Sequence, residues 1–448
     1  MILPRYCSLA AVGRVLTIYL LLVGYSAAYE YFYATQLTEL YHDDYTTFDS
    51  LKLDIYAAIC FLTPLALLPI GTRLRTPGQL IIGAASVLIF IPIPIVFVPM
   101  VTPAEFWRVY ALLWLGYLAV NTLGSCAVNI PLPAVSERRF QQILLIFFLI
   151  AGLGFAYVLG TNHFQIVSLD KAHAAQSDVT VAGWQGYLMV GYMTSFGSLL
   201  VAVAIMYRKY YLLPLAVLGW VGCYGALSER GAVLMPFWIA YMYVAQRVFF
   251  RESVVRFLFA VMAPFLICLA LSFILGLEDR KSAFYDAFTL ANYRLYSVPA
   301  IGFNVYYDYF SLHPYTYWSH IGFISNFVPY PYGQPLAMVL AEQYSLGNDN
   351  ASFLETDGLA AAGPLMLPFI SIIFGLVMLT INSCMRGLNI TMCAIIMAGA
   401  CIALIDTGLG PSLLTNGLIA LTVLMLFAPR NASWNLRYLT QRTRAAVA

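Results

Sequence analysis

The chain has 448 residues, of which 61% are apolar and only 10% are charged, and its mean hydropathy is +0.80. This composition excludes an ordinary soluble globular protein and indicates a polytopic membrane protein. The net charge is only +2, and no basic loop is interleaved with aromatic residues, so we expect no nucleic-acid partner.

Twelve apolar segments follow one another along the chain, and each is predicted to cross the lipid bilayer as a helix. They cover residues 15–31, 55–70, 80–100, 109–126, 142–160, 184–206, 212–227, 232–245, 257–275, 359–381, 390–405 and 413–427. The first follows Arg5 and Arg14 and lacks a small-residue cleavage site, so we expect a retained anchor. The predicted fold class is all-α: a single integral membrane domain over residues 1–448, with both termini on one side.

Basic residues collect on one side of this topology, which the positive-inside rule identifies as the cytoplasm. With the termini inside, 16 of the 23 Lys and Arg residues lie there. Only Glu137 and Glu252 of the 21 acidic residues share that side, and all five histidines lie on the other. Since the rule does not force this second asymmetry, we expect the working face to be extracytoplasmic.

The ninth and tenth apolar segments are separated by residues 278–358, a predicted long periplasmic loop that holds about a third of the 32 tyrosines. Apolar residues at helical spacing predict an amphipathic surface helix over 279–295, ended by Pro299. A second short helix is predicted over 335–345. Tyrosine suits both a membrane interface and stacking on sugar rings, and its density here favours a glycan groove over 304–332. The candidate substrate-binding residues of this groove are Tyr306, Tyr317 and Trp318.

Carboxylates and a histidine of the loop are candidates for acid–base chemistry. Asp357 precedes an apolar segment, so its simplest role is an N-cap; the alternative is a general base. Glu342, Asp349 and Glu355 are rivals for that role. His320 suits either a structural hydrogen bond or a proton carrier.

Two arginines are candidates for binding an anionic substrate. Arg230 lies between two external span ends, where a charge near the apolar zone is costly and points to function, although pairing with Glu229 would explain it structurally. Arg294 lies late in the predicted surface helix. Two guanidinium groups can bind a pyrophosphate and stabilise its charge as it leaves.

No cofactor or metal is predicted. Neither GxxxxGK[ST] nor a strand-linked GxGxxG occurs, and the cytoplasmic loops are too short for a nucleotide-binding domain. The eight cysteines fall in apolar segments or at their cytoplasmic ends, and no disulfide framework or CxxC metal pair is visible.

At these residues the chain resembles the O-antigen polymerase family, the Wzy-type oligosaccharide repeat-unit polymerases. The resemblance rests on Ser228-Glu229-Arg230-Gly231-Ala232, on the long external loop with Arg294, and on the run that ends in Asp357-Gly358 before an apolar segment with Gly375. It implies a GT-C-like glycosyltransferase of the bacterial inner membrane that works without nucleotide sugars.

The resemblance also implies the reaction and the partners. The enzyme would move a growing glycan from undecaprenyl pyrophosphate to the terminal sugar of another lipid-linked repeat unit, with a chain-length regulator in the membrane as a possible partner. Arg230 and Arg294 would bind the pyrophosphate, and His320 or a loop carboxylate would deprotonate the acceptor hydroxyl.

Three alternatives remain open. An O-antigen ligase shares the long loop and transfers glycan to a lipid A core. A GT-C enzyme that uses a polyprenyl monophosphate sugar would carry acidic residues in its first external loop, where this chain has His42-Asp43-Asp44. A flippase or transporter of lipid-linked glycans would show charges or breaks within several spans, and Pro92 and Pro94 are the clearest breaks.

Overall fold

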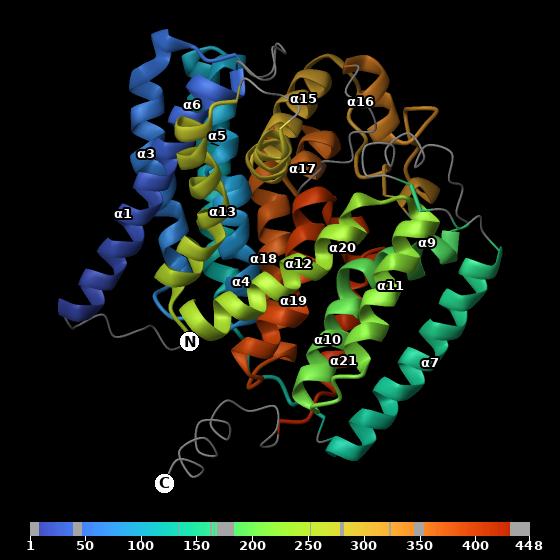
Figure 1. Ribbon diagram of the computed structural model, residues 1–448. Helices are drawn as coiled ribbons and strands as arrows, with labels where there is room; N and C mark the ends of the chain where they lie inside the picture. Colours follow the sequence, from blue (N-terminus) through green and yellow to red (C-terminus); the bar gives the residue numbers. More distant parts are fainter. Residues whose placement is uncertain are drawn as a thin grey trace.

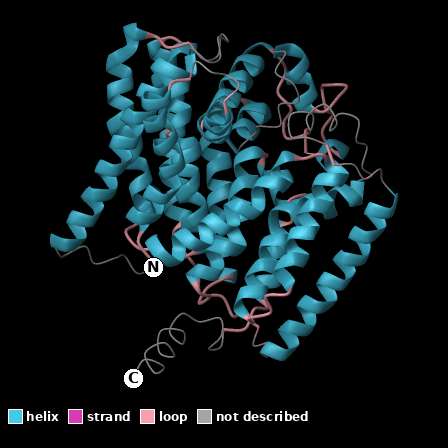
Figure 2. Cartoon of the chain, in the orientation of Figure 1, coloured by secondary structure: helices cyan, strands magenta, loops and turns pink. Residues whose placement is uncertain are grey.

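The regular structure of the chain is helical throughout the part that the structure describes (Figures 1 and 2). The computed structural model describes residues 9–38, 47–133, 135–161, 164, 166–167, 183–250, 252–277, 282–321, 324–344 and 354–430. Within these ranges the only extended pairing is one isolated antiparallel bridge between Arg73 and Ser253. The prediction of an all-α fold is confirmed.

The first half of the chain forms long helices with short connections, and π-helical or 3-10 turns continue several of them. They are α1 (Leu9–Phe32), η1 (Tyr33–Leu37), η3 (Ser50–Lys52), α3 (Leu53–Leu67), η4 (Leu68–Ile70), α4 (Pro77–Ala85), η5 (Ser86–Phe90), α5 (Pro92–Phe97), η6 (Val98–Met100), α6 (Pro103–Gly124), α7 (Glu137–Thr161), α9 (Gly183–Gly191), η7 (Tyr192–Phe196), α10 (Gly197–Met206) and α11 (Leu212–Leu227).

The second half contains more short helices. They are α12 (Arg230–Val244), η8 (Ala245–Phe250), α13 (Val254–Leu275), α14 (Ala283–Phe288), η9 (Thr289–Leu295), α15 (Val298–Leu312), η10 (Ile324–Asn326), α16 (Leu336–Tyr344), α17 (Leu354–Ala362), η11 (Pro364–Met366), α18 (Leu367–Cys384), α19 (Ile390–Asp406), α20 (Leu409–Leu414) and α21 (Leu418–Leu426).

Eight helical segments in these ranges are long and apolar enough to cross a membrane, which supports a multi-pass membrane protein. They are Ala10–Leu37, Ser50–Ile70, Pro77–Met100, Glu137–Thr161, Gly183–Met206, Gly231–Phe249, Val254–Leu275 and Pro364–Cys384. Each overlaps one of the twelve predicted spans. Of the other four, two are shorter apolar helices (Leu212–Leu227 and Ile390–Leu404), one is α6, and the last is interrupted between α20 and α21. A count of twelve crossings therefore stays a prediction.

One interrupted helix, Pro77–Met100, runs through the centre of the molecule. Its most apolar stretch is buried along its whole length. Helices α18 and α19 pack on its first part, α4, and α15 packs on α5. Because this helix is apolar on every side, it is stable when other helices surround it completely. The arrangement puts the polar ends of a fully enclosed helix close to the two surfaces of the molecule.

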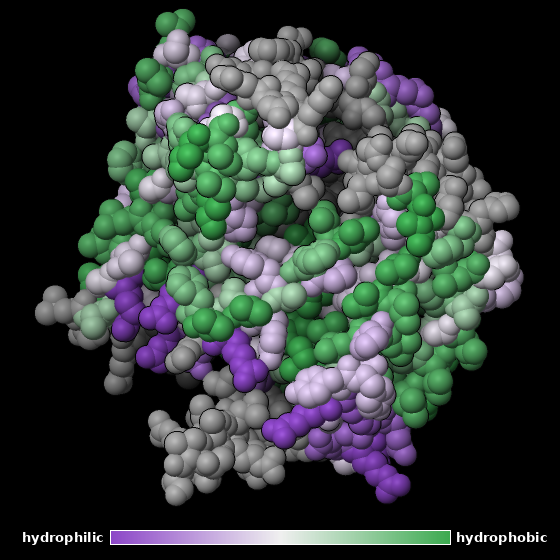
Figure 3. Space-filling model, viewed as in Figure 1, coloured by the Kyte–Doolittle hydropathy of each residue, from purple (hydrophilic) through white to green (hydrophobic). Residues whose placement is uncertain are grey.

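Hydrogen bonds join several of the connections between helices at the lower end of the molecule in Figure 1. If successive helices cross the membrane in alternating directions, these connections all lie on the same side. The Leu74 amide donates to the Glu252 carbonyl at 2.8 Å, and the Val128 amide donates to Ser383 Oγ at 2.9 Å. Hydrophilic residues gather along the same lower edge in the space-filling view, below a broad hydrophobic surface (Figure 3). This is the end that the positive-inside rule predicts to be cytoplasmic.

A second set of hydrogen bonds joins the connections at the opposite end. Tyr307 Oη donates to Glu105 Oε1 at 2.5 Å, and the Thr316 amide donates to the Ala360 carbonyl at 2.8 Å. These two contacts tie the segment between α13 and α17 to the start of α6 and to α17. These contacts therefore agree with the predicted division of the connections between helices into two groups, one at each end of the molecule.

Part of the predicted long loop is a buried helix rather than a surface groove. The surface helix predicted over 279–295 corresponds to α14 and η9, and the predicted helix over 335–345 is α16. Between them, α15 (Val298–Leu312) packs on α5, and Asn304 Nδ2 donates to the Val96 carbonyl at 2.9 Å. Pro299, expected to end a helical pattern, lies in the first turn of α15, a position where its missing N–H costs nothing.

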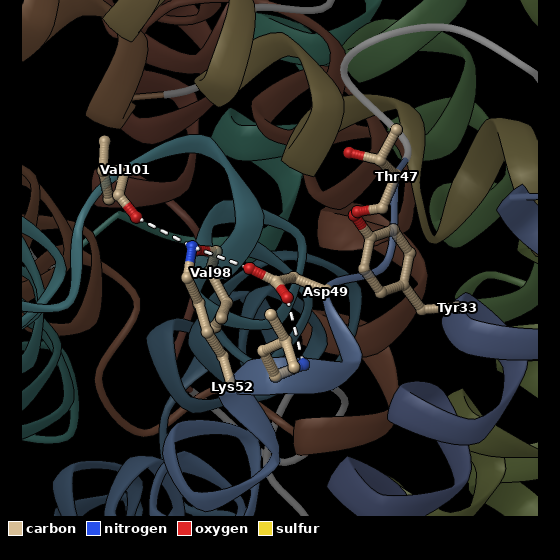
Figure 4. A network of polar contacts seen from close by, with 7 residues as sticks. Tyr33, Thr47, Asp49, Lys52, Val98 and Val101 are labelled. Carbon is tan, nitrogen blue, oxygen red and sulfur yellow. Dashed lines mark hydrogen bonds and ion pairs between the residues drawn. The ribbon is translucent and has the colours of Figure 1, made fainter.

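Lys52 closes the upper end of the enclosed helix (Figure 4). Its ammonium group donates to the carbonyls of Val98 (3.1 Å) and Val101 (3.0 Å) and forms an ion pair with Asp49 at 3.1 Å. Carbonyls at the C-terminal end of a helix have no intrahelical donor and carry partial negative charge, so a cation there is favourable. Lys52 and Asn304 therefore supply donors that the enclosed helix itself lacks.

Replacing Lys52 by Met is expected to destabilise the purified protein in detergent by about 2 kcal/mol, because carbonyls at a buried helix end lose a charged donor. The measurement is chemical or thermal unfolding. Arg108→Met is the matched control, since the Arg108–Glu105 ion pair is exposed and such pairs contribute little. Equal losses from the two variants would show that Lys52 does not act as a cap.

Candidate functional site

A strained aromatic turn follows α15 and lies against the end of α17. Tyr317 and Trp318 both have positive φ, +48° and +69°, a region that bulky side chains rarely adopt. The turn is anchored because the amides of Thr316 and Tyr317 donate to the carbonyls of Ala360 and Ala361 at 2.8 and 3.0 Å. Strain of this kind persists only where the surroundings impose it, and it concentrates at functional sites.

The turn places His320 against Asp357. The distance from His320 Nε2 to Asp357 Oδ1 is 3.5 Å, and their side chains are only 11% and 8% exposed. On the other side of the imidazole ring, Nδ1 lies 2.7 Å from Thr316 Oγ1. The ring of Trp318 also stacks near His320, with centroids 6.2 Å apart. His320 is therefore held from two sides while its Nε2 faces a carboxylate.

The hydrogen bonds of Thr316 determine which nitrogen of His320 carries a proton. The single hydroxyl proton of Thr316 is donated to the Ala360 carbonyl at 2.9 Å. Thr316 Oγ1 must then accept from His320 Nδ1, so Nδ1 is protonated. In the neutral ring Nε2 has a free lone pair that faces Asp357 Oδ1. The two groups can share one proton, so the pair as a whole can take up a proton and hold it between the imidazole ring and the carboxylate.

Asp357 is held in place by α20, which packs against it, and not by its own helix, α17. Its Oδ2 accepts from the Leu409 amide at 2.6 Å, at the start of α20. A Cβ atom on Gly408 would lie only 2.4 Å from Asp357 Oδ1, so the carboxylate needs glycine there. The expectation that Asp357 is the N-cap of the tenth span is wrong, because it lies inside α17 and caps α20 instead.

Glu355 occupies the opposite side of α17. Its side chain is 1% exposed, and no other described residue donates a hydrogen bond to either carboxyl oxygen. Burial raises the pKa of this carboxyl group well above its ordinary value of 4.5, and the nearby charge of Asp357 raises it further. Two positions along a helix turn the side chain by about 200°, so Glu355 points away from the face that Asp357 uses.

The remaining acid–base candidates lie apart from this pair. Glu342 is exposed, and its Oε2 accepts from Gln334 Nε2 at 2.8 Å. Asp349 and the His42-Asp43-Asp44 run lie outside the described residues. Of the candidates, the structure therefore brings together His320 and Asp357, with Glu355 on the same short helix.

The predicted substrate-binding residues are found in different settings. Tyr306 is buried in α15, whereas the Tyr317 side chain is 60% exposed. Arg294 is exposed in the last turn of η9, and Arg230 begins α12 with a side chain that lies outside the described part.

Most tyrosines of the predicted groove pack against one another. Tyr309 stacks on His313 with centroids 4.0 Å apart, and it also contacts the rings of Tyr332 and Tyr344. These contacts form an aromatic cluster at the upper end of the molecule, beside the strained turn. In the part of the view where Figure 1 shows α15 and α17, Figure 3 shows a hollow with hydrophilic atoms at its back.

Three residues that contact the His320–Asp357 pair were not predicted from the sequence. Thr316 lies four residues before His320, and this short spacing in the chain could have indicated a contact between them. Gly408 and Leu409 are about 50 residues from Asp357, and only the packing of α20 against α17 brings them together.

The described residues contain no group of three or more His, Cys, Asp or Glu side chains that could hold a metal ion. No protein-family model matches the chain, and neither a curated protein nor a solved structure does.

Replacing Gly408 by Ala is expected to displace the Asp357 carboxylate and to destabilise the protein by about 1–3 kcal/mol, because the added methyl group overlaps both carboxyl oxygens. The measurement is unfolding in detergent. Gly410→Ala is the control, since a Cβ atom there meets only the flexible Ile321 side chain at 3.4 Å. If Gly408→Ala is as stable as the control, Asp357 is not held in this position.

Replacing Glu355 by Gln is expected to flatten the pH dependence of stability. The folded-state pKa of Glu355 lies above the unfolded value of 4.5, so its protonated form favours folding. That contribution is complete below the unfolded pKa and is lost as pH rises toward the folded-state pKa. As pH rises above about 5, the melting temperature of the wild type should fall more than that of the variant. Parallel curves would contradict a raised pKa.

Proposed function

We propose that this protein is a membrane glycosyltransferase that polymerises lipid-linked oligosaccharide repeat units at the extracytoplasmic face. The observation that carries the proposal is the buried His320–Asp357 pair, with Nδ1 of the imidazole ring committed to Thr316 and Nε2 directed at the carboxylate. Such a pair can remove a proton from a hydroxyl group, and glycan transfer requires that the acceptor hydroxyl lose its proton.

In the proposed reaction, the hydroxyl oxygen of the acceptor sugar attacks the anomeric carbon of the donor glycan. The bond from that carbon to the pyrophosphate oxygen breaks, and undecaprenyl pyrophosphate leaves with the bonding electrons. The hydroxyl proton passes to the His320–Asp357 pair, where it is held between Nε2 of the imidazole ring and the carboxylate. No nucleotide is consumed, because the pyrophosphate linkage of the donor supplies the leaving group.

The surroundings of the pair support a glycan substrate. The aromatic cluster around Tyr309 lies beside the strained turn, and the exposed ring of Tyr317 offers an apolar face on which a sugar can stack. Arg294 is exposed, and we assign to it and to Arg230 the binding of the pyrophosphate. Twelve crossings, a GT-C-like arrangement, cytoplasmic termini and a bacterial inner membrane belong to the same proposal.

A second candidate is a flippase or transporter of lipid-linked glycans. Interrupted helices within membrane spans are typical of transporters, and both Pro77–Met100 and Gly183–Met206 contain π-helical turns. This observation concerns the spans rather than the His320–Asp357 pair. The polymerase remains the proposal because it gives that pair a chemical role.

Replacing His320 by Gln or Asp357 by Asn is expected to reduce polymer formation at least 100-fold, because the acceptor hydroxyl loses its base. The measurement is the banding pattern of surface glycan from a deletion strain complemented with each variant. His313→Gln is the matched control, since His313 stacks on Tyr309 and belongs to the same segment. Normal polymer from both site variants, at wild-type protein levels, would rule out the assigned base.

The same banding pattern separates the candidate functions. A strain without the chain should carry a single repeat unit on the lipid core if the protein is a polymerase, and none if it is a ligase or a flippase. Asp43→Asn combined with Asp44→Asn should abolish activity only in an enzyme that uses polyprenyl monophosphate sugars. Arg230→Ala and Arg294→Ala should each shorten the polymer if these arginines bind pyrophosphate.

A further inference from the structure

Two connections at the lower end of the molecule are joined through their backbones. One links η4 to α4 and the other links η8 to α13, and the Leu74 amide of the first donates to the Glu252 carbonyl of the second at 2.8 Å. Arg73 and Ser253 lie opposite each other in an antiparallel bridge. Side chains that face each other in this way project to the same side, with Cβ atoms about 5 Å apart.

Arg256 and Arg247 are held close to this bridge. Ser253 is the N-cap of α13, and its hydroxyl group accepts from the Arg256 amide at 3.5 Å. The Arg256 guanidinium group donates to the Phe249 carbonyl, in η8, at 3.3 Å. Arg247 lies two residues before Phe249, and its guanidinium group donates to Tyr243 Oη at 2.7 Å. Both guanidinium groups are therefore fixed against η8 and the helix before it.

Four exposed arginines of these segments form what we call the basic cluster: Arg73, Arg75, Arg247 and Arg256. Leu74 is buried between the first two, so the alternation of an extended chain directs both arginines outward. Glu252 is the one acidic residue in 71–76 and 247–256, and no member of the cluster forms an ion pair within the described part of the chain. Each guanidinium group carries five N–H donors, so most of them are available to a ligand.

The position of Arg256 favours an anion nearby. It lies in the first turn of α13, where the helix dipole contributes partial positive charge, and no acidic residue occupies that turn. Arg138 and Arg139, at the start of α7, provide a contrast, because Glu137 stands beside them in the first turn. An anion at the start of α13 would be favoured both by the helix and by the guanidinium groups.

Exposed apolar side chains lie directly beside the basic cluster. Val248 and Phe249 follow Arg247 in η8, and the ring of Phe249 contacts that of Phe259 on α13, with centroids 5.9 Å apart. Where Figure 1 shows the lower ends of α12 and α13, Figure 3 shows a hydrophilic surface bordering a hydrophobic one. A lipid presents the same border, between its headgroup and its acyl chains.

We propose that the basic cluster binds the phosphate group of an anionic phospholipid, whose acyl chains lie against Val248, Phe249 and Phe259. Guanidinium groups bind phosphate oxygens through paired, charge-assisted hydrogen bonds. The positive-inside rule accounts for basic residues at this end of the molecule, but it does not require two separate connections to pair and gather them. The site does not depend on the proposed glycan transfer.

Native mass spectrometry of the full-length protein with added phosphatidylglycerol tests the site. Arg73→Gln combined with Arg256→Gln is expected to raise the Kd for this lipid by about 10-fold or more, because the phosphate loses charged donors. Arg138→Gln combined with Arg139→Gln is the matched control, since it removes two exposed charges from the same end. The control should change the Kd by about twofold at most. Equal weakening in both double variants would show a response to overall charge and overturn the site.

Two competing ligands test the chemistry of the occupant. Phosphatidylcholine, which has no net charge, should bind the wild type about 10-fold or more weakly than phosphatidylglycerol does. Equal affinity for the two lipids would overturn the proposal. Inorganic phosphate in large excess should not release the bound lipid, because it lacks acyl chains, and release would mean that the cluster takes free phosphate instead.

A second double variant makes the test independent of the folding of the first. Arg75→Gln combined with Arg247→Gln removes the other two charges of the basic cluster and leaves the bridge between Arg73 and Ser253 in place. It should also raise the Kd for phosphatidylglycerol, by more than the control pair does. An unchanged Kd in this variant would overturn a site that uses all four arginines.

Discussion

The structure depends on one constraint: the backbone of a helix that is enclosed by other helices must find all its hydrogen-bond partners inside the protein. The enclosed helix Pro77–Met100 shows how this is met. Lys52 and Asn304 donate to carbonyls at its upper end, and Thr76 and Gln79 form a capping box at its start. Unpaired backbone groups in apolar surroundings cost several kcal/mol each, so polar side chains are needed at the helix ends.

The same constraint explains where the candidate site lies. The start of α20 is a helix end inside the bundle, and Asp357 accepts a hydrogen bond from its Leu409 amide. This contact fixes one carboxylate oxygen and leaves the other directed at His320. Thr316 performs a similar double task, because it joins the strained turn to α17 and also accepts from the imidazole ring. The side chains that form hydrogen bonds with these backbone groups therefore also hold the His320–Asp357 pair in position.

The aromatic residues between α13 and α17 also have two roles. Most of the tyrosines at the upper end contact one another, which makes this part of the segment a packed unit rather than an open groove. Tyr317 contacts the ring of Tyr315, but its backbone is held at positive φ and its side chain is exposed. A packed aromatic layer that leaves the ring of Tyr317 exposed gives the site a firm wall and a surface on which an apolar sugar face can rest.

The sequence by itself determined the helical class, the multi-pass character and the two-ended distribution of charge, because these follow from the apolar content and the order of the segments. It also identified His320, Asp357 and Glu355 by residue type. Only the tertiary structure decided that His320 and Asp357 meet, that Asp357 caps α20 rather than its own helix, and that α15 is buried. These facts rest on packing between segments far apart in the chain, which hydropathy and local spacing do not encode.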